Sequence, residues 1–549
     1  MSLKPRRLQE VPEETAQIAR AVFPKGNTYM MMRDELGILY EDEDFAALFP
    51  VVGQPAESPW RLALVLVMQF AENLTDRQAA EAVRARIDWK YALCLDLRDV
   101  GFDSSVLSEF RDRLIRGSAE EKLLDIMLKH FRTRGLVKAR GRQRTDSTHV
   151  LAAIHVLNRL ENVAQTLQQA LESLAITAPD WLKGHIPKDW FDRYAKKIEE
   201  YRLPQGQAER QAFGEMIGVD GHALLTWVDD PAAPDGLRDL PAIHILRLLW
   251  QQQYEQQNGR LRWRNKDELP PSAERIASPY DIEARYSTKR SVTWVGYKLH
   301  LTETCDEDLP HLITHVETTP ATEQDTDALP KIHQALDQHD LLPSEHIVDN
   351  GYSSGEVLAD SQSQHQIDLL CPVSVNTSWQ AKDPNAFDLS QFLIDWEAQQ
   401  VTCPRGKVSQ CWSPSRGYKG KPLIEVVFRQ ADCRPCPVRE RCTHSKVSPR
   451  EITLQPQEEF RALEAARQRQ KTEPFKKRYA KRAGVEGTIS QAAYAVHARR
   501  SRYIGLVKTH LQHILTAAAM NLLRVFAWFD ERPLSKTRKS RFAALADAI

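Results

Sequence analysis

The sequence lacks any long apolar run and carries no net charge. No uninterrupted apolar stretch reaches the roughly 18 residues that indicate a membrane-spanning helix. The first residues, MSLKPRRLQEVPEE, turn polar and acidic at once and do not resemble a signal peptide. The 74 basic and 74 acidic residues balance, but this excludes no DNA-binding function, because the distribution of charge matters more than its sum. We expect a cytoplasmic protein without a membrane partner.

Cysteine is also scarce, with 8 in 549 residues, yet five of these lie between Cys403 and Cys442. In a cytoplasmic chain, clustered thiols favour metal binding over disulfides. The cysteines outside this segment, at positions 94, 305 and 371, are expected to be ordinary core residues.

The length exceeds what one compact domain usually holds, and a hydrophobic content of 42% is enough for a buried core. Basic residues cluster at 132–144, 471–508 and 532–541. Such clusters can follow a phosphate backbone, although each is equally well explained as a solvated helix face. In the first cluster, the candidate DNA contacts are Arg140, Arg142 and Arg144.

The first 135 residues predict short helices. Ser58-Pro59 suits a helix start, Thr75 with Gln78 forms a capping-box pattern, and Asp103-Ser-Ser opens a further helix. Several short helices joined by tight turns are compatible with a helix-turn-helix DNA reader or with a helical bundle used for dimerisation. The pattern leaves both interpretations open.

The remainder predicts an α/β region interrupted by insertions. Asp146 lies in a short strand, residues 157–257 are helical, and β-branched and aromatic residues at 292–302 predict a strand with a partner at 312–318. A helix at 325–338 is followed by strands at 346–349 and 367–373, and the chain is helical from 457 onward. This order is typical of an α/β fold.

Three acidic residues are candidates for catalysis. Asp349 ends an apolar strand and precedes a glycine turn, which is where α/β sheets place ligands, and Asp146 has a comparable setting. Glu486 is expected on a helix that presents Tyr479 and Arg482 on the same face. Both are candidate DNA contacts, and Arg482 could neutralise phosphate charge. Carboxylates are the ligands that Mg²⁺ prefers, and two such ions about 3.5–4 Å apart promote phosphodiester displacement. Taken singly, each of these acids is more often solvated or capping than catalytic.

Several segments stand in a fixed order along the chain: SPWRLALVLVMQFAENLTDRQAAEAV with DSSVLSEFRDRL, TDST around Asp146, ARYSTKRSVTWVGYKLHL, VDNGYSS around Asp349, and Tyr479-x2-Arg482-x3-Glu486. Together they resemble the DDE transposases of bacterial insertion sequences over most of the chain. The family's C-terminal signature has a lysine seven positions after its glutamate, where this chain has Ala493. Arg499, Arg500 or Lys508 is the candidate replacement for that phosphate contact.

The resemblance implies an α/β RNase H-like catalytic core with a helical N-terminal domain, a helical insertion and a Cys-rich, zinc-ribbon-like insertion. The expected boundaries are a helical DNA-binding or dimerisation domain at 1–135, the core at 136–156 and 276–378, the helical insertion at 157–275, the Cys-rich insertion at 379–456, C-terminal core helices carrying Glu486 at 457–530, and a basic tail at 531–549. Asp146 and Asp349 stand 203 positions apart, so a core of this kind requires the insertions.

The cysteine cluster predicts a structural Zn²⁺ site. Tetrahedral Zn²⁺ takes four thiolate or imidazole ligands, and a Cys-x2-Cys pair commonly supplies two. The preferred ligands are Cys403, Cys433, Cys436 and Cys442, with Cys411 or His444 in reserve. Unliganded reduced thiols are the alternative.

The resemblance further implies a DNA transposase that uses two Mg²⁺ or Mn²⁺ ions, held by Asp146, Asp349 and Glu486. Its partner is double-stranded DNA, cut as an endonuclease at terminal inverted repeats and joined to target DNA, with a homodimer in the synaptic complex. Localisation is then bacterial, cytoplasmic and nucleoid-associated. Two other hypotheses remain: an RNase H-like nuclease that cuts without strand transfer, and a non-catalytic DNA-binding relative.

Overall fold

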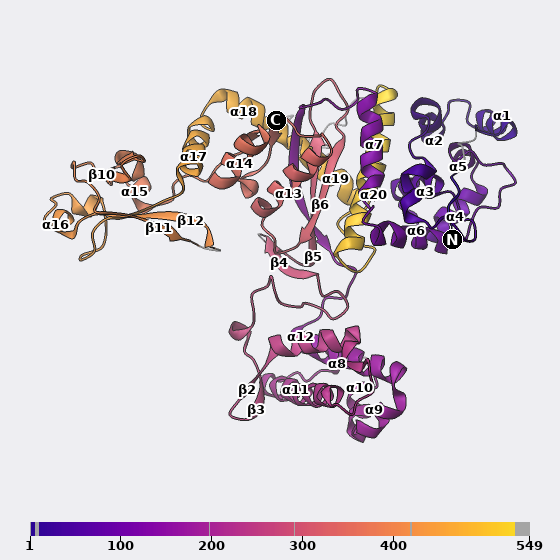
Figure 1. Cartoon of the computed structure of the whole chain (residues 1–549), viewed down its shortest axis with the longest axis horizontal. Helices are drawn as coiled ribbons and strands as arrows, with labels where there is room; N and C mark the ends of the chain where they lie inside the picture. The colour runs from indigo at the N-terminus through magenta and orange to yellow at the C-terminus, as the bar shows by residue number, and fades with distance from the viewer. Residues whose placement is uncertain (1, 6–9, 197, 290, 418–419, 533–549) are drawn as a thin grey trace, which may run out of the picture.

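The computed structural model describes residues 2–5, 10–196, 198–289, 291–417 and 420–532. The basic tail predicted at 531–549 lies outside the described residues from position 533 onward. A central sheet with its helices carries a helical region on one side and two projecting insertions (Figure 1). Within the described ranges, no helix is long and apolar enough to cross a membrane.

The central sheet consists of β1 (Arg142–Leu151), β4 (Arg285–Lys289), β5 (Val292–Thr304), β6 (Ile313–Pro320), β7 (Glu345–Ile347) and β8 (Asp368–Leu370). β5 pairs antiparallel with β1, β4 and β6, whereas β7 pairs parallel with both β1 and β8. Three long antiparallel strands thus continue into two short parallel ones. This mixed α/β arrangement is compatible with an RNase H-like core.

Helices from the second half of the chain cover this sheet: α13 (Asp325–Gln338), α14 (Gly355–His365), α17 (Gln457–Arg469), α18 (Glu473–Tyr479), α19 (Ala483–Tyr494) and α20 (Leu506–Phe529). The long helix α20 is buried along most of its length and packs on β6. Its apolar side chains fill the space between the sheet and the N-terminal helices.

The N-terminal helices are α1 (Glu13–Val22), α2 (Thr28–Met31), α3 (Pro59–Ala71), α4 (Asp76–Ala85), α5 (Ile87–Ala92), α6 (Ser105–Arg116) and α7 (Lys122–Thr133). The predicted capping box is present, since Thr75 and Gln78 exchange side-chain to backbone hydrogen bonds. The apolar helix α3 and helix α7 both contact α20. As a result, the N-terminal helices and the sheet share one hydrophobic core.

The helical insertion comprises α8 (Arg159–Thr177), α9 (Pro179–His185), α10 (Lys188–Tyr194), α11 (Gln207–Asp229) and α12 (Pro241–Gln253), followed by the hairpin β2 (Tyr254–Gln257) and β3 (Arg260–Trp263). It projects from the sheet in Figure 1 and has its own hydrophobic core. Three glycines of α11, Gly214, Gly218 and Gly221, leave room for aromatic rings that pack on the helix. For example, a Cβ on Gly221 would lie 2.2 Å from the Trp250 ring.

The Cys-rich insertion contains α15 (Trp379–Lys382), β9 (Leu393–Asp395), β10 (Gln400–Thr402), β11 (Cys411–Arg416), β12 (Pro422–Val427), α16 (Gln430–Cys433) and β13 (Glu451–Leu454). It projects from the opposite side of the sheet to the N-terminal helices (Figure 1). Its buried core consists of Phe392, Val401, Val426, Phe428, Ile452 and Leu454.

Two local predictions were wrong. The strands expected at 346–349 and 367–373 are present but shorter, since they end at Ile347 and Leu370, with one further hydrogen bond from the Val348 amide to the Leu370 carbonyl. The single helix expected to carry Tyr479 and Glu486 is divided into α18 and α19 by a 3₁₀ turn at Ala480–Arg482. In that turn the carbonyl of Lys481 accepts a hydrogen bond from Arg144 Nη1 at 2.6 Å, so the turn is bonded to the sheet.

Candidate active site

Strand register brings Asp146 and Asp349 to the same level of the sheet. The parallel pairing of β1 with β7 sets Arg144 opposite Ile347, and each aspartate lies two residues further along its strand direction. Asp349 follows the end of β7 and its Oδ1 accepts a hydrogen bond from the Gly351 amide at 2.8 Å. Two neighbouring parallel strands therefore bring both carboxylates to the edge of the sheet where β7 ends.

Glu486 reaches the same edge from α19, which a buried ion pair fastens to the sheet. Glu303 on β5 is fully buried and accepts from Arg144 Nε and Arg524 Nη1, both at 2.7 Å. It also accepts from the Thr488 hydroxyl of α19 at 2.5 Å. Burial raises the pKa of Glu303, but the two guanidinium groups outweigh burial and the net pKa is lowered. No sequence pattern indicated Glu303, because its partners stand far away in the chain.

Arg482 lies among the three carboxylates. Its Nη2 is 2.7 Å from Asp146 Oδ2 and 3.7 Å from Asp349 Oδ2, and its Nη1 is 3.3 Å from Glu486 Oε1. The structure therefore brings the three predicted acids to one cationic group. The Glu486 side chain is 69% exposed, whereas that of Asp146 is 14% exposed, so the site opens to solvent on the α19 side.

Asp146 and Arg482 shift one another's pKa values. Burial raises the pKa of Asp146, and Arg482 offsets only part of this rise. Burial lowers the pKa of Arg482, but Asp146 and the neighbouring groups outweigh it, so the net pKa is raised. Burial also raises the pKa of Tyr479 to about 12, which keeps its phenol protonated beside these carboxylates. Arg482 thus offsets part of the negative charge of the three carboxylates.

A polar pocket adjoins the carboxylates and was not predicted. It is lined by Lys289, Trp294, Lys298, Asp325 and Gly351, among others. Lys298 Nζ donates to Asp325 Oδ1 at 3.0 Å, and the Ser147 hydroxyl donates to Asp325 Oδ2 at 3.3 Å. A Cβ on Gly351 would lie 3.0 Å from Asp349 Oδ1 and 3.1 Å from Asp325 Oδ2, so this glycine leaves room for both. The sequence signal for the pocket was the ARYSTKRSVTWVGYKLHL segment, which carries Lys289, Trp294 and Lys298.

The predicted DNA contacts fall into different environments. Arg144 is 5% exposed and its guanidinium is bonded to Glu303, His311 and the Lys481 carbonyl, so the expected phosphate contact is replaced by a packing role. The remaining candidates are partly or fully exposed: Arg140, Arg142, Tyr479, Arg499, Arg500 and Lys508. Of these, Arg142 pairs with Asp306, Lys508 pairs with Asp112, and Arg499 donates to Thr148. Ala493 is buried.

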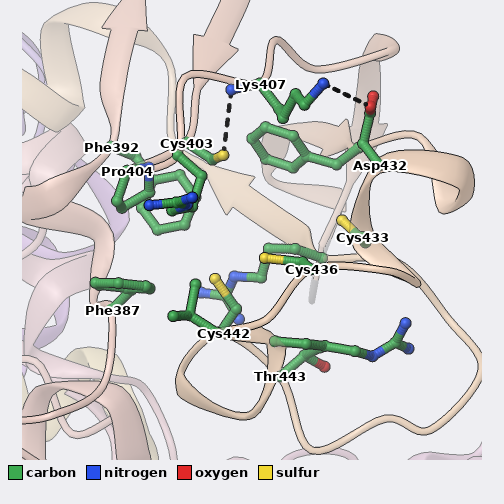
Figure 2. Close-up of a pocket in the computed structure, with 15 residues that line it drawn as sticks. Phe387, Phe392, Cys403, Pro404, Lys407, Asp432, Cys433, Cys436, Cys442 and Thr443 are labelled. Carbon is green, nitrogen blue, oxygen red and sulfur yellow. Dashed lines mark hydrogen bonds and ion pairs between the residues drawn. The ribbon is translucent and has the colours of Figure 1, made fainter.

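The four preferred cysteines line one pocket of the Cys-rich insertion (Figure 2). Burial raises the pKa of Cys442 to about 11, with the neighbouring Cys403, Cys436 and Cys433 adding to the rise. The reserve ligands lie elsewhere: Cys411 is exposed on β11, and His444 stacks on Trp379. Cys94, Cys305 and Cys371 are buried, as expected of core residues.

Among the described residues, the only group of three His, Cys, Asp or Glu side chains with ligand atoms within 4.8 Å of one another is Glu121, Asp125 and His339. The carboxylates around Arg482 and the four thiols are therefore more widely spaced than the ligands of one ion. The ligand atoms of the carboxylates, or of the thiols, must therefore move closer together before either set can bind one ion.

Two family models match the chain. Residues 402–526 match one described as a transposase DDE domain, which includes part of the Cys-rich insertion, Arg482, Glu486 and most of α20. Residues 19–113 match a transposase domain (DUF772), which covers most of the N-terminal helices. No curated protein matches the chain.

Proposed function

Because these two matches support an insertion-sequence DDE transposase, we propose that the chain cuts DNA at the ends of its element and joins them to target DNA. Asp146, Asp349 and Glu486 are the catalytic residues in this proposal. The substrate is double-stranded DNA with terminal inverted repeats, and because two ends must be paired, the working form is at least a dimer.

The observation that carries the proposal is the convergence of three carboxylates on Arg482. These acids come from three separate parts of the chain, and mutual repulsion would oppose their approach without a cation between them. Three hard oxygen donors suit Mg²⁺ or Mn²⁺. When bound, such ions activate the attacking oxygen and stabilise the leaving one.

The protein's own side chains then have distinct tasks. Arg482 offsets part of the carboxylates' negative charge in the free chain. Its Nε has no hydrogen-bond partner, so this N–H is left to donate to a phosphate of bound DNA. Lys289 and Lys298 in the adjoining pocket supply further positive charge for the strand that reaches Asp349. Tyr479, Arg499 and Arg500 contribute DNA contacts next to this edge. Glu303 holds α19, and hence Glu486, against the sheet.

The Cys-rich insertion completes the proposal as a structural Zn²⁺ site. Four sulfur atoms lining one pocket match the ligand number and type of structural zinc. When bound, the ion would cross-link α16 to the loop after β10, where Cys403 lies. This site stabilises the fold and takes no part in the reaction.

The test is cleavage and strand transfer of labelled terminal repeats in Mg²⁺ by the full chain and by Asp349→Asn. Loss of several kcal/mol of transition-state stabilisation lowers the rate about 10³-fold or more. Asp360→Asn is the matched control, because Asp360 is an exposed aspartate on the neighbouring helix α14, and it should cleave normally.

Undiminished cleavage by Asp349→Asn would reject the assignment of the carboxylates. Cleavage by the wild type without strand-transfer products would indicate a nuclease. Repeat binding that needs no metal and yields no cleavage would indicate a non-catalytic relative. Circular dichroism and repeat binding by each variant separate a catalytic defect from loss of folding.

A further inference from the structure

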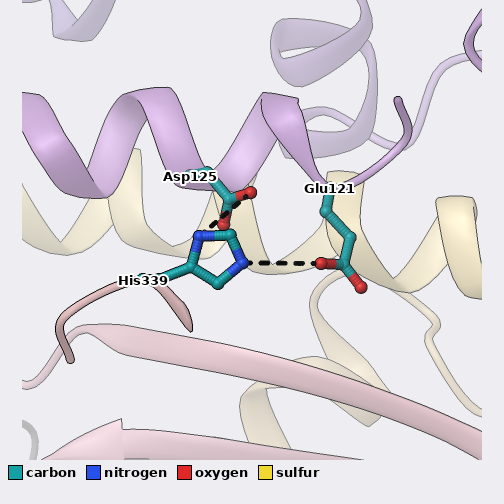
Figure 3. A group of neighbouring side chains, drawn as sticks. All are labelled: Glu121, Asp125 and His339. Carbon is teal, nitrogen blue, oxygen red and sulfur yellow. Dashed lines mark ion pairs between the residues drawn. The ribbon is translucent and has the colours of Figure 1, made fainter. Parts of the chain in front are cut away.

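A second group of ionisable side chains lies where the N-terminal helices meet the sheet (Figure 3). Glu121 immediately precedes α7, Asp125 lies in its first turn, and His339 follows α13. The side chains of Glu121 and Asp125 are four residues apart on one face of α7 and point toward the His339 ring (Figure 3). Two like charges at this spacing repel each other unless a cation compensates them.

The distances in this group exceed those of hydrogen bonds. His339 Nε2 is 3.7 Å from Glu121 Oε2, and its Nδ1 is 3.6 Å from Asp125 Oδ2. Charge-assisted hydrogen bonds are about 2.7–2.9 Å long. By contrast, ligand atoms about 2.0–2.2 Å from a tetrahedral Zn²⁺ lie about 3.3–3.6 Å from one another. The two measured distances run to different nitrogens of the His339 ring, but one ligand atom from each of the three residues lies within 4.8 Å of the other two. A small approach of these atoms brings them to the spacing of ligands that share an ion.

A second histidine faces the same group from α20. His510 Nε2 is 3.6 Å from Glu121 Oε1, the carboxylate oxygen that does not face His339. Its Nδ1 lies 3.2 Å from the Thr318 hydroxyl of β6. A histidine that binds metal through one ring nitrogen is usually oriented by a hydrogen bond at the other, and His510 has this arrangement.

We propose that Glu121, Asp125 and His339 form a binding site for a divalent transition-metal ion, with Zn²⁺ preferred. His510 lies outside this group and becomes the fourth ligand when its ring moves closer. Imidazole and carboxylate together suit Zn²⁺, whereas Mg²⁺ prefers oxygen alone. One ring nitrogen of His339 coordinates, and the ion connects α7 to α20 and to the end of α13. The site is independent of the carboxylates around Arg482 and of the thiol pocket.

The test counts Zn²⁺ retained per chain after equilibrium dialysis of the full-length protein in excess Mg²⁺, which keeps Zn²⁺ from oxygen-only sites. Wild type should retain about one Zn²⁺ more than His339→Gln and than Asp125→Asn, because a site with a ligand removed loses affinity. Added Zn²⁺ should raise the thermal unfolding temperature of the wild type more than that of these variants.

The matched control is His365→Gln. His365 Nδ1 lies 3.8 Å from Asp337 Oδ2, an ion pair of similar length that belongs to no group of three ligand atoms in the described part of the chain. This variant should retain as much Zn²⁺ as wild type.

Co²⁺ distinguishes this site from the thiol pocket. Removing His339 should abolish d–d absorption from the site while leaving the thiolate-to-cobalt charge-transfer band of the cysteines unchanged. If His339→Gln misfolds, Glu121→Gln takes its place, since Glu121 is exposed. Equal Zn²⁺ content and equal Co²⁺ spectra in wild type and in a folded variant would overturn the proposal, whatever the outcome of the cleavage assay.

Discussion

The two insertions both project from the sheet, but they differ in how much apolar surface each buries in its own core. The helical insertion buries a large set of apolar side chains from α8, α11, α12 and β2, including Leu167, Trp250 and Tyr254. The Cys-rich insertion also projects from the sheet, yet its buried hydrophobic core has only six residues, among them Phe392 and Phe428. Small units rarely bury enough apolar surface to fold alone and often rely on a metal instead. On the proposed function, we therefore expect one insertion to be stabilised by hydrophobic burial and the other by a metal in its thiol pocket.

Removing zinc should have the largest effect and should be confined to the Cys-rich insertion. Structural Zn²⁺ contributes about 10–16 kcal/mol of apparent binding free energy in small zinc-binding peptides, so chelation or Cys436→Ser should unfold residues 379–456 locally. Hydrogen exchange should rise there while the helical insertion stays protected. Cys411→Ser is the matched control, since Cys411 is exposed and lies outside the pocket lining, and it should change nothing.

Truncating the core of the helical insertion should have the next largest effect. Leu167 is fully buried on α8, so Leu167→Ala should cost about 2–5 kcal/mol of unfolding free energy. Urea unfolding followed by hydrogen exchange within 157–275 measures this loss, which chelators should not change. Glu172→Ala, an exposed site on the same helix, should stay within about 0.5 kcal/mol of wild type. Zinc dependence of the Leu167 effect would contradict the comparison.

Overpacking the glycine face of α11 should have a smaller effect. Replacing a glycine inside a helix by alanine usually stabilises the fold by about 1 kcal/mol. Gly221→Ala, however, places a methyl group against the Trp250 ring. We expect a net loss of about 1–3 kcal/mol from this overpacking. Gly184→Ala on α9 has open space around it and should be neutral or stabilising. Stabilisation by Gly221→Ala would mean that the ring can move aside, and chemical denaturation decides between these outcomes.

The smallest expected effect is a pH dependence of the helical insertion. Burial raises the pKa of Asp220, although Tyr194 donates to its Oδ2 at 2.6 Å and Arg193 lies 3.0 Å away. Because the folded pKa exceeds the unfolded one, this group stabilises the fold at low pH, and the stabilisation is lost as pH rises through the raised pKa. The difference in urea midpoint between wild type and Asp220→Asn should therefore change as the pH rises above about 4, the ordinary pKa of an aspartate. A pH-independent difference would contradict the raised pKa.

Local patterns predicted much of this fold, and long-range contacts account for the errors. The helix at 325–338 and the capping box at Thr75 depend on neighbouring residues, and both are present. Arg144 stands in a basic run that suggested a phosphate contact, but its partner Glu303 lies on another strand and buries it. Sequence spacing could not reveal that Arg482, expected to face DNA, lies among the carboxylates in the free chain. The thiol pocket was predictable because its ligands are close together in the sequence.

Helix α20 has a consequence for how the protein can be divided. It contacts β6 along one side and α3 and α7 along the other, and its apolar residues are buried by both. A fragment without the first 133 residues would leave that second side of α20 in water and favour aggregation. The N-terminal helices also cannot swivel against the sheet without opening this contact. Any duplex they grip is therefore presented to the Asp146–Asp349 edge at one fixed angle.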